Sequence, residues 1–177
     1  MNTYLSILRG VNVGGHKRIR MAELKELYES LNLGYVKTFI QSGNVVFQYK
    51  DMDPLELAAK IKNKIKEVFG FDVAVFIRTK EDFQKIIEKN PFKDDEVNKL
   101  YVTFLSEKPI TLPITEIERI KDESEKFIIS GKEIYLFIPN GYGRTKLSND
   151  FFEKKLEVSA TTRNWKTVNK LFEIADN

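Results

Sequence analysis

Basic or amide side chains gather in four short stretches of the sequence, three of which contain glycine, and this combination is suited to binding anions. The first stretch, residues 9–18, contains Gly14 and Gly15, and no Asp or Glu occurs between Arg9 and Glu23. Backbone amides near glycines, together with guanidinium and ammonium groups, hold phosphates and carboxylates. The stretch therefore predicts an anion site near a helix N-terminus, although its glycine spacing is not that of a P-loop. The alternative is a flexible, solvent-exposed basic loop that binds no anion.

Residues 41–44 and 141–146 form the second and third stretches. Gln41 and Asn44 flank a Ser-Gly pair that is typical of a tight turn, and their amides could read the polar edge of a ligand. Residues 141–146 place Tyr142 between two glycines, ahead of two cations. This order favours stacking on a base and contact with phosphates. The alternative is a long connection in which the tyrosine packs on its own strand.

The fourth stretch, residues 161–165, directly precedes an amphipathic run that predicts the last helix. Thr162 is expected to be the N-cap of this helix, and Trp165 falls on its apolar face, so we expect it in the core. Arg163 and Asn164 stand where the helix amides begin, and there they could orient an anion or anchor a loop carbonyl.

The candidate ligand-binding residues of these stretches are basic, amide or aromatic. They are Arg9, Asn12, Lys17, Arg18, Gln41, Asn44, Tyr142, Arg144, Lys146, Arg163 and Asn164. The one histidine, His16, lies in the first glycine loop. It would be a general base only with an orienting partner such as Asn12 or Ser42, and solvent exposure is the alternative.

Composition excludes several kinds of chemistry. The 177 residues include no cysteine and one histidine, which excludes disulfides, thiolate or multi-histidine metal sites and cysteine nucleophiles. We expect no cofactor and no metal. The net charge of +3 is too small to indicate nucleic acid by itself. No apolar run is long enough to cross a membrane, so we expect a cytoplasmic protein without a membrane partner.

Periodicity along the chain predicts the same order of elements twice: strand, helix, strand, strand, helix, strand. Expected strands in the first half include residues 3–8 and 71–78, and the hairpin strands are 36–40 and 45–49. The predicted class is α+β, with two ferredoxin-like (split βαβ) halves that have antiparallel-containing sheets and helices on one face. The halves are residues 1–90, with a connecting helix, and 91–177, with the C-terminal helix.

This topology places the four stretches in two groups. A right-handed crossover makes the first two strands of each half parallel. The loop after the first strand and the following hairpin then leave the same edge of the sheet, which brings residues 9–18 to residues 41–44. In the second half, residues 139–146 meet residues 161–165 at the opposite edge. Whether the two groups meet in space stays open.

Several motifs, in this order, resemble the bacterial family DUF1697, a domain of unknown function. They are Leu8-Arg9-Gly10-Val11-Asn12-Val13-Gly14-Gly15, Gln41-Ser42-Gly43-Asn44-Val45-Val46-Phe47, Pro139-Asn140-Gly141, Gly143-Arg144 and Thr161-Thr162-Arg163-Asn164-Trp165. The sequence departs from the family pattern at Thr145 and Lys166. The resemblance implies two intertwined ferredoxin-like halves and brings no established activity or catalytic residue.

Three functions remain open at this point. The first is binding of an anionic ligand, a nucleotide or a nucleic-acid phosphate, by the glycine-rich basic loops. The second is an enzyme acting on a phosphorylated or acylated small molecule, with His16 or a hydroxyl as its reactive group. The third is a structural or protein-interaction module in which the motifs only fix loops. The ligand, any reaction and the oligomeric state are not predicted.

Overall fold

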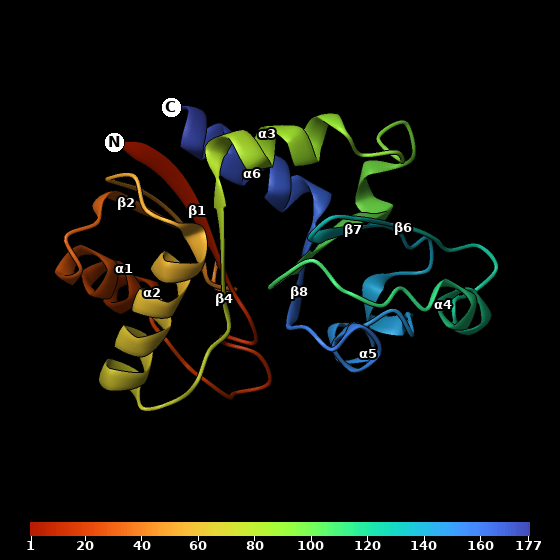
Figure 1. Cartoon of the computed structure of the whole chain (residues 1–177), viewed down its shortest axis with the longest axis horizontal. Coiled ribbons are helices and arrows are strands. Elements are labelled where there is room, and N and C mark those ends of the chain that lie inside the picture. The colour runs from red at the N-terminus through yellow and green to blue at the C-terminus, as the bar shows by residue number, and fades with distance from the viewer. The chain divides into compact units, whose positions relative to one another are not determined.

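A computed structural model describes residues 1–177 (Figure 1). The chain forms two compact units, one of Met1–Lys85 with Lys170–Asn177 and the other of Ile86–Asn169. The sequence prediction had set the halves at 1–90 and 91–177; in the structure the last residues of the chain group with the first unit. None of the helices combines the length and the apolar character needed to cross a lipid bilayer.

The first unit contains one four-stranded sheet and the helices that cover it. The elements in chain order are β1 (Asn2–Leu8), α1 (Met21–Ser30), β2 (Gly34–Phe39), β3 (Asn44–Tyr49), α2 (Pro54–Phe69), β4 (Val75–Thr79) and the start of α3 (Lys80–Glu88). The strand order is β2-β3-β1-β4, and every neighbouring pair is antiparallel. This is the ferredoxin-like arrangement that the alternating periodicity predicts.

Local sequence signals place the helix ends of this unit. Asp53 caps α2, because its Oδ1 accepts from the amides of Leu55 at 2.8 Å and Glu56 at 3.3 Å. Gly70 ends the same helix in a left-handed conformation with φ 80°. Before α3, Thr79 and Asp82 exchange two hydrogen bonds between side chain and backbone, which form a capping box.

Helices α1 and α2 lie on one face of this sheet, as Figure 1 shows. Leu24 of α1 and Ile61 of α2 share a buried core with Tyr4, Val45 and Phe47 of the strands. The side chains alternate along each strand, so Leu5 and Ile7 point to the other face, where they are also buried. Both faces of β1 are therefore covered, and apolar side chains occur on each of them.

The second unit repeats the pattern. Its elements are the rest of α3, β5 (Leu100–Leu105), α4 (Ile114–Ile120), β6 (Lys126–Ser130), β7 (Glu133–Phe137), α5 (Asn149–Leu156), β8 (Ala160–Asn164) and the start of α6 (Trp165–Asp176). The strand order β6-β7-β5-β8 is again antiparallel throughout. Ile117 of α4 and Phe152 of α5 pack against Leu105, Ile134 and Leu136 of the sheet.

The likeness of the units extends to the last strand of each. Arg78 is the fourth residue of β4 and Arg163 the fourth of β8, and both are buried. Each strand leads directly into a helix, α3 or α6. One expectation needs correction here: the strand predicted over 71–78 occupies only Val75–Thr79. Phe71 instead stacks on Phe69, the last residue of α2, with ring centroids 6.2 Å apart.

Candidate functional site

The first unit contains a pocket of about 580 Å³ at the end of β1, which we call the first pocket. Its walls come from the loop after β1, the start of α1 and the β2–β3 turn. The lining residues are Asn12, Gly15, Arg18, Ile19, Arg20, Glu23 and Gln41. The predicted approach of residues 9–18 to residues 41–44 is therefore confirmed.

Asn12 joins the two segments of the first pocket. Its Nδ2 donates to the carbonyl oxygens of Ile19 at 2.9 Å and Gln41 at 2.7 Å, and its Oδ1 accepts from the amide of Ile19 at 2.8 Å. Asn12 has φ 58°, a left-handed conformation that asparagine adopts more readily than most residues. With all three contacts made inside the protein, this side chain shapes the pocket and is not available to a ligand.

The charges of the first pocket come from Arg18 and Arg20, which are exposed, with Glu23 beside them. Two other predicted residues have structural partners. Lys17 donates to the carbonyl oxygen of Asp72 at 2.6 Å, and Asn44, which is fully buried, donates to Phe39 and Ser42 within the turn. Their hydrogen bonds account for both residues without a ligand.

Neither Arg9 nor His16 lines this pocket. The backbone amide of Arg9 donates to the carbonyl oxygen of Ala74 at 3.0 Å, which ties the loop to the segment before β4. His16 is exposed, and its neighbourhood is a small turn closed by a bridge to Val13. A general base needs an orienting partner, and the structure gives His16 neither a pocket nor such a partner.

The second unit contains a pocket of about 480 Å³, which we call the second pocket. It lies between the end of α4, the segment that follows it, and the loop after β7. The lining residues are Arg119, Ile120, Lys121, Asp122, Glu125, Asn140, Arg144, Thr145 and Lys146. Two residues predicted from sequence, Arg144 and Lys146, thus lie beside two cations that the sequence reading had not singled out.

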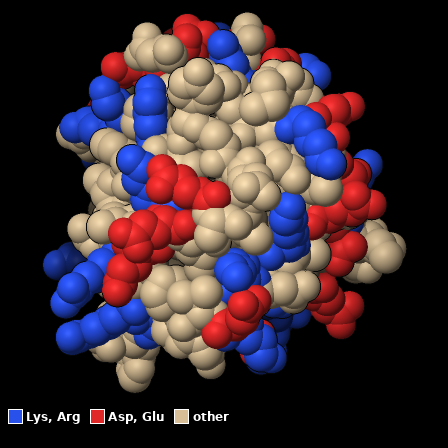
Figure 2. Space-filling model, turned by 90° about the vertical axis from the view of Figure 1, so that its left-hand side faces the viewer, with Lys and Arg blue, Asp and Glu red and all other residues tan.

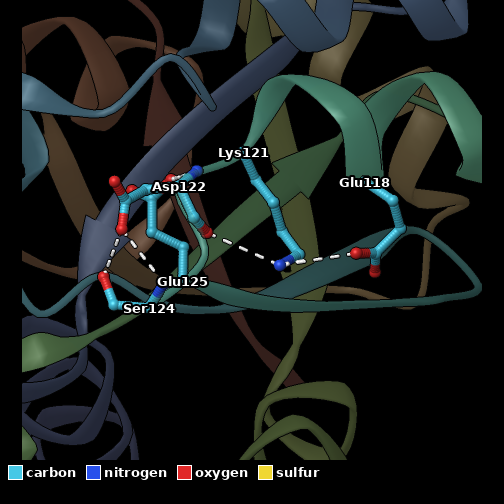
Figure 3. A network of polar contacts seen from close by, with 5 residues as sticks. All are labelled: Glu118, Lys121, Asp122, Ser124 and Glu125. Atoms are coloured by element: carbon cyan, nitrogen blue, oxygen red, sulfur yellow. Dashed lines mark hydrogen bonds and ion pairs between the residues drawn. The ribbon is translucent and has the colours of Figure 1, made fainter.

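Polar contacts fix the segment after α4, as Figure 3 shows. Asp122 Oδ1 accepts from the amide of Ser124 at 3.0 Å and from its hydroxyl at 2.5 Å. These hydrogen bonds hold the pKa of the Asp122 carboxyl below its ordinary value, so it is ionised at neutral pH. Lys121 Nζ lies 3.4 Å from Glu118 and 3.5 Å from the carbonyl oxygen of Asp122, which leaves its charge largely compensated.

Tyr142 does not line the second pocket. Its ring packs on Tyr101 with centroids 5.2 Å apart, and its hydroxyl lies 3.4 Å from Asn149 Oδ1. The alternative for this residue was packing on its own strand; in the structure the ring packs instead on Tyr101 of β5, the strand next to β7 in the sheet. Thr162 Oγ1 also donates to Oδ1 of Asn149, the first residue of α5, at 2.7 Å, so Asn149 contacts both Tyr142 of the loop and Thr162 of β8.

Arg163 and Asn164 have structural partners as well. Arg163 is 8% exposed, and its guanidinium donates to Thr161 Oγ1 at 3.1 Å and to the carbonyl oxygen of Thr162 at 3.0 Å. Burial lowers its pKa to about 10, so the group remains charged at neutral pH. Asn164, and not Thr162 as expected, caps α6: its Oδ1 accepts from Thr167 at 2.8 Å. The cap lies there because β8 continues through Asn164.

A family model described as a protein of unknown function (DUF1697) matches residues 1–135. The chain belongs to the DUF1697 family. This DUF1697 chain is similar to the solved structure of the conserved bacterial protein SP0830 from Streptococcus pneumoniae. The two are 25% identical over 98% of each chain, with a TM-score of 0.72. A comparison with curated proteins gives no match.

A second solved structure, protein BT0572 from Bacteroides thetaiotaomicron, is 13% identical to this chain. The match covers 97% of this chain and 96% of the Bacteroides chain. Its TM-score of 0.24 is too low for it to carry an argument. The family model establishes the DUF1697 membership, and the Streptococcus structure supports the fold. No activity follows from either.

Sequence reasoning missed part of each pocket of this DUF1697 chain. In the second pocket the missed polar residues are Arg119, Lys121, Asp122 and Glu125, whereas Asn140 and Thr145 lie in the predicted segment 139–146; in the first pocket the missed residue is Glu23. The spacing of Asp122, Ser124 and Glu125 is typical of a turn fixed by side-chain hydrogen bonds, and this signal could have marked the segment as ordered. Its meeting with residues 144–146 is a long-range contact that spacing does not reveal.

Proposed function

We propose that the protein binds a small phosphate-bearing ligand in the second pocket. The observation that carries this proposal is the meeting of Arg119, Arg144 and Lys146 around one cavity of about 480 Å³. Arg144 and Lys146 are exposed, and neither side chain is paired with a carboxylate. Guanidinium and ammonium groups that share a cavity and have no internal partner are the donors that phosphate oxygens require.

The size of the cavity favours a small molecule over a polynucleotide. Ligand pockets commonly measure roughly 300 to 1,000 Å³, which admits a sugar phosphate or a mononucleotide. A nucleic-acid surface needs instead a continuous basic stripe along which many phosphates lie. Figure 2 shows the face of the protein that carries α1 and α2, and there acidic and basic side chains are interspersed. No continuous basic stripe of that kind is seen on this face.

The test is a thermal-shift and calorimetric titration of the full chain with inorganic phosphate, glucose 6-phosphate and adenosine monophosphate. A ligand that binds only the native form raises the melting temperature. The variant R144A/K146A is expected to lose this response and to weaken binding by at least about tenfold, since it removes two charge-assisted contacts. The control K108A/K154A removes the same charge from exposed positions outside the pocket.

Equal binding by both double variants, or no binding of any phosphate compound by the parent protein, overturns the proposal. A single-stranded oligonucleotide serves as a further probe in the same titration. Tight oligonucleotide binding with a steep dependence on salt, in the absence of binding by the small phosphates, would replace the small ligand with nucleic acid.

A further inference from the structure

The second pocket carries an acidic wall as well as a basic one. Asp122 and Glu125 line it together with the arginines and lysines. A pocket specialised for phosphate alone gains nothing from carboxylates, because like charges between ligand and wall are unfavourable. Their presence indicates that the ligand has a second group, which carries a positive charge.

Glu125 is the more informative of the two acids. It is 4% exposed, although glutamate is rarely buried without a partner. Its Oε1 accepts from the amide of Asp122 at 2.9 Å. No buried side-chain nitrogen or oxygen of the protein lacks a partner, and Oε2 of Glu125 takes part in no hydrogen bond. Oε2 is therefore reached by solvent, and Glu125 is one of the residues that line the second pocket.

The neighbouring charges leave this carboxylate unneutralised. The nearest cation before it in the sequence, Lys121, already lies 3.4 Å from Glu118. Lys126, the residue after Glu125, pairs with Asp95 at 3.3 Å. A nearly buried carboxylate oxygen that faces a cavity and has no cationic partner is best satisfied by a donor that arrives with the ligand.

We propose that the ligand is a phosphate ester that also carries an amine. This inference rests on the proposed function. Its phosphate contacts Arg119, Arg144 and Lys146, and its ammonium group donates to Oε2 of Glu125. Asp122 lies beside Glu125 and adds negative charge to that wall. The basic and acidic walls contact different groups of the ligand and so set its orientation in the pocket. They also favour an amine-bearing ligand, because a plain phosphate ester leaves the Glu125 carboxylate without a donor.

The experiment compares matched ligands by calorimetry. One pair is phosphoethanolamine and ethyl phosphate; the longer pair is glucosamine 6-phosphate and glucose 6-phosphate. Within each pair only the amine is changed, and the two pairs differ in the separation of amine and phosphate. At least one amine compound is expected to bind about tenfold more tightly than its partner, the effect of one charge-assisted hydrogen bond.

The variant E125Q assigns the preference to Glu125. Glutamine keeps an oxygen that accepts from Asp122, so the turn is preserved, but it removes the charge. We expect E125Q to bind the amine and plain members of a pair within about twofold of each other, with the affinity for plain phosphate retained or improved. E123Q, at an exposed position outside the pocket, is the matched control and is expected to keep the preference.

The outcomes distinguish failure of this inference from failure of the proposed function. Phosphate binding without any preference for amines in either pair overturns this inference and leaves the proposed function standing. A preference that persists in E125Q assigns the amine to another group and also overturns it. If E125Q does not fold, the discrimination within the pairs by the parent protein still decides whether an amine is recognised. Failure of every phosphate compound to bind overturns the proposed function itself.

Discussion

The Nδ2 atom of Asn12 lies 2.7 Å from the carbonyl oxygen of Gln41, and this contact joins the loop after β1 to the β2–β3 turn. Two segments that are far apart in sequence thus share one amide side chain. The same side chain also holds the backbone of Ile19 through two further hydrogen bonds. Asn12 therefore determines the shape of the first pocket.

Replacing Asn12 with alanine is expected to lower the free energy of unfolding by about 2 to 4 kcal/mol. The loss combines three hydrogen bonds, each contributing about 1 kcal/mol when partly exposed, with the cost of a left-handed alanine. Asn12→Gly relieves the backbone cost but not the hydrogen bonds, so it is expected to be the milder variant. Urea denaturation measures both, and equal stability of N12A and the parent protein would contradict the assigned role.

The close approach of Gly43 to Leu8 predicts a severe effect of a methyl group in the β2–β3 turn. A Cβ on Gly43 would lie 2.8 Å from Leu8 Cβ, and the residue has φ 81°. Gly43→Ala is expected to cost about 2 to 4 kcal/mol, because the left-handed backbone and the overpacking add. Gly70→Ala is the matched control: its φ is 80°, but nothing lies within 4 Å of the new Cβ. Its expected cost is only about 1 kcal/mol.

Thermal or chemical denaturation of these two glycine variants separates backbone strain from steric overlap. Similar losses for G43A and G70A would show that Leu8 gives way without cost. A much larger loss for G43A would support the contact between the turn and the end of β1, where Leu8 also donates from its amide to the carbonyl oxygen of Gly43 at 2.9 Å.

Several helix ends were predictable because local signals specify them. The Asp53 cap, the Gly70 stop and the box of Thr79 and Asp82 each involve residues within a few positions of one another. The same reasoning misplaced the cap of α6 at Thr162. That hydroxyl is used by Asn149, a partner thirteen positions earlier whose approach depends on the packing of α5 against β8.

The candidate sites were predictable only in part, for a similar reason. Glycine and basic residues in one stretch pointed to Arg144 and Lys146, but the opposite wall comes from the segment after α4, which shows no basic run. Burial was not predictable for Arg163, since a strand of only five residues gives little information on which face is covered. Long-range packing decides which cations face solvent.

The raised pKa of Tyr135 predicts that the protein loses stability at high pH. Its hydroxyl donates to the carbonyl oxygen of Ile86 at 2.9 Å, and burial raises its pKa from the ordinary value of 10 to about 12. The unfolded chain therefore ionises first, and the stabilisation that is complete below pH 10 is lost as the pH rises to about 12. Burial shifts the pKa of Tyr28 in the same direction.

Tyr135→Phe is expected to lower the free energy of unfolding by about 1 kcal/mol at pH 7, because the carbonyl of Ile86 loses its donor. Above pH 10 the variant is expected to lose stability less steeply than the parent protein. Tyr35→Phe, which changes an exposed ring, is the control and leaves the slope unchanged. Denaturant titrations at several pH values measure these slopes, and an unchanged slope in Y135F would rule out this proton linkage.

The hydroxyls of Thr103 and Thr162 form a chain that ends on Asn149. Thr162 Oγ1 donates to Asn149 Oδ1 at 2.7 Å, so the 2.7 Å contact with Thr103 must use Thr103 as the donor. Thr162→Val is expected to cost about 1 to 3 kcal/mol, since it leaves the fully buried Thr103 hydroxyl without an acceptor. The double variant T103V/T162V removes both groups and is expected to cost about 1 kcal/mol less than the two single changes together. A double-mutant cycle by urea denaturation measures this coupling, with the exposed Thr111→Val as a control; strictly additive losses would mean that the chain is not formed.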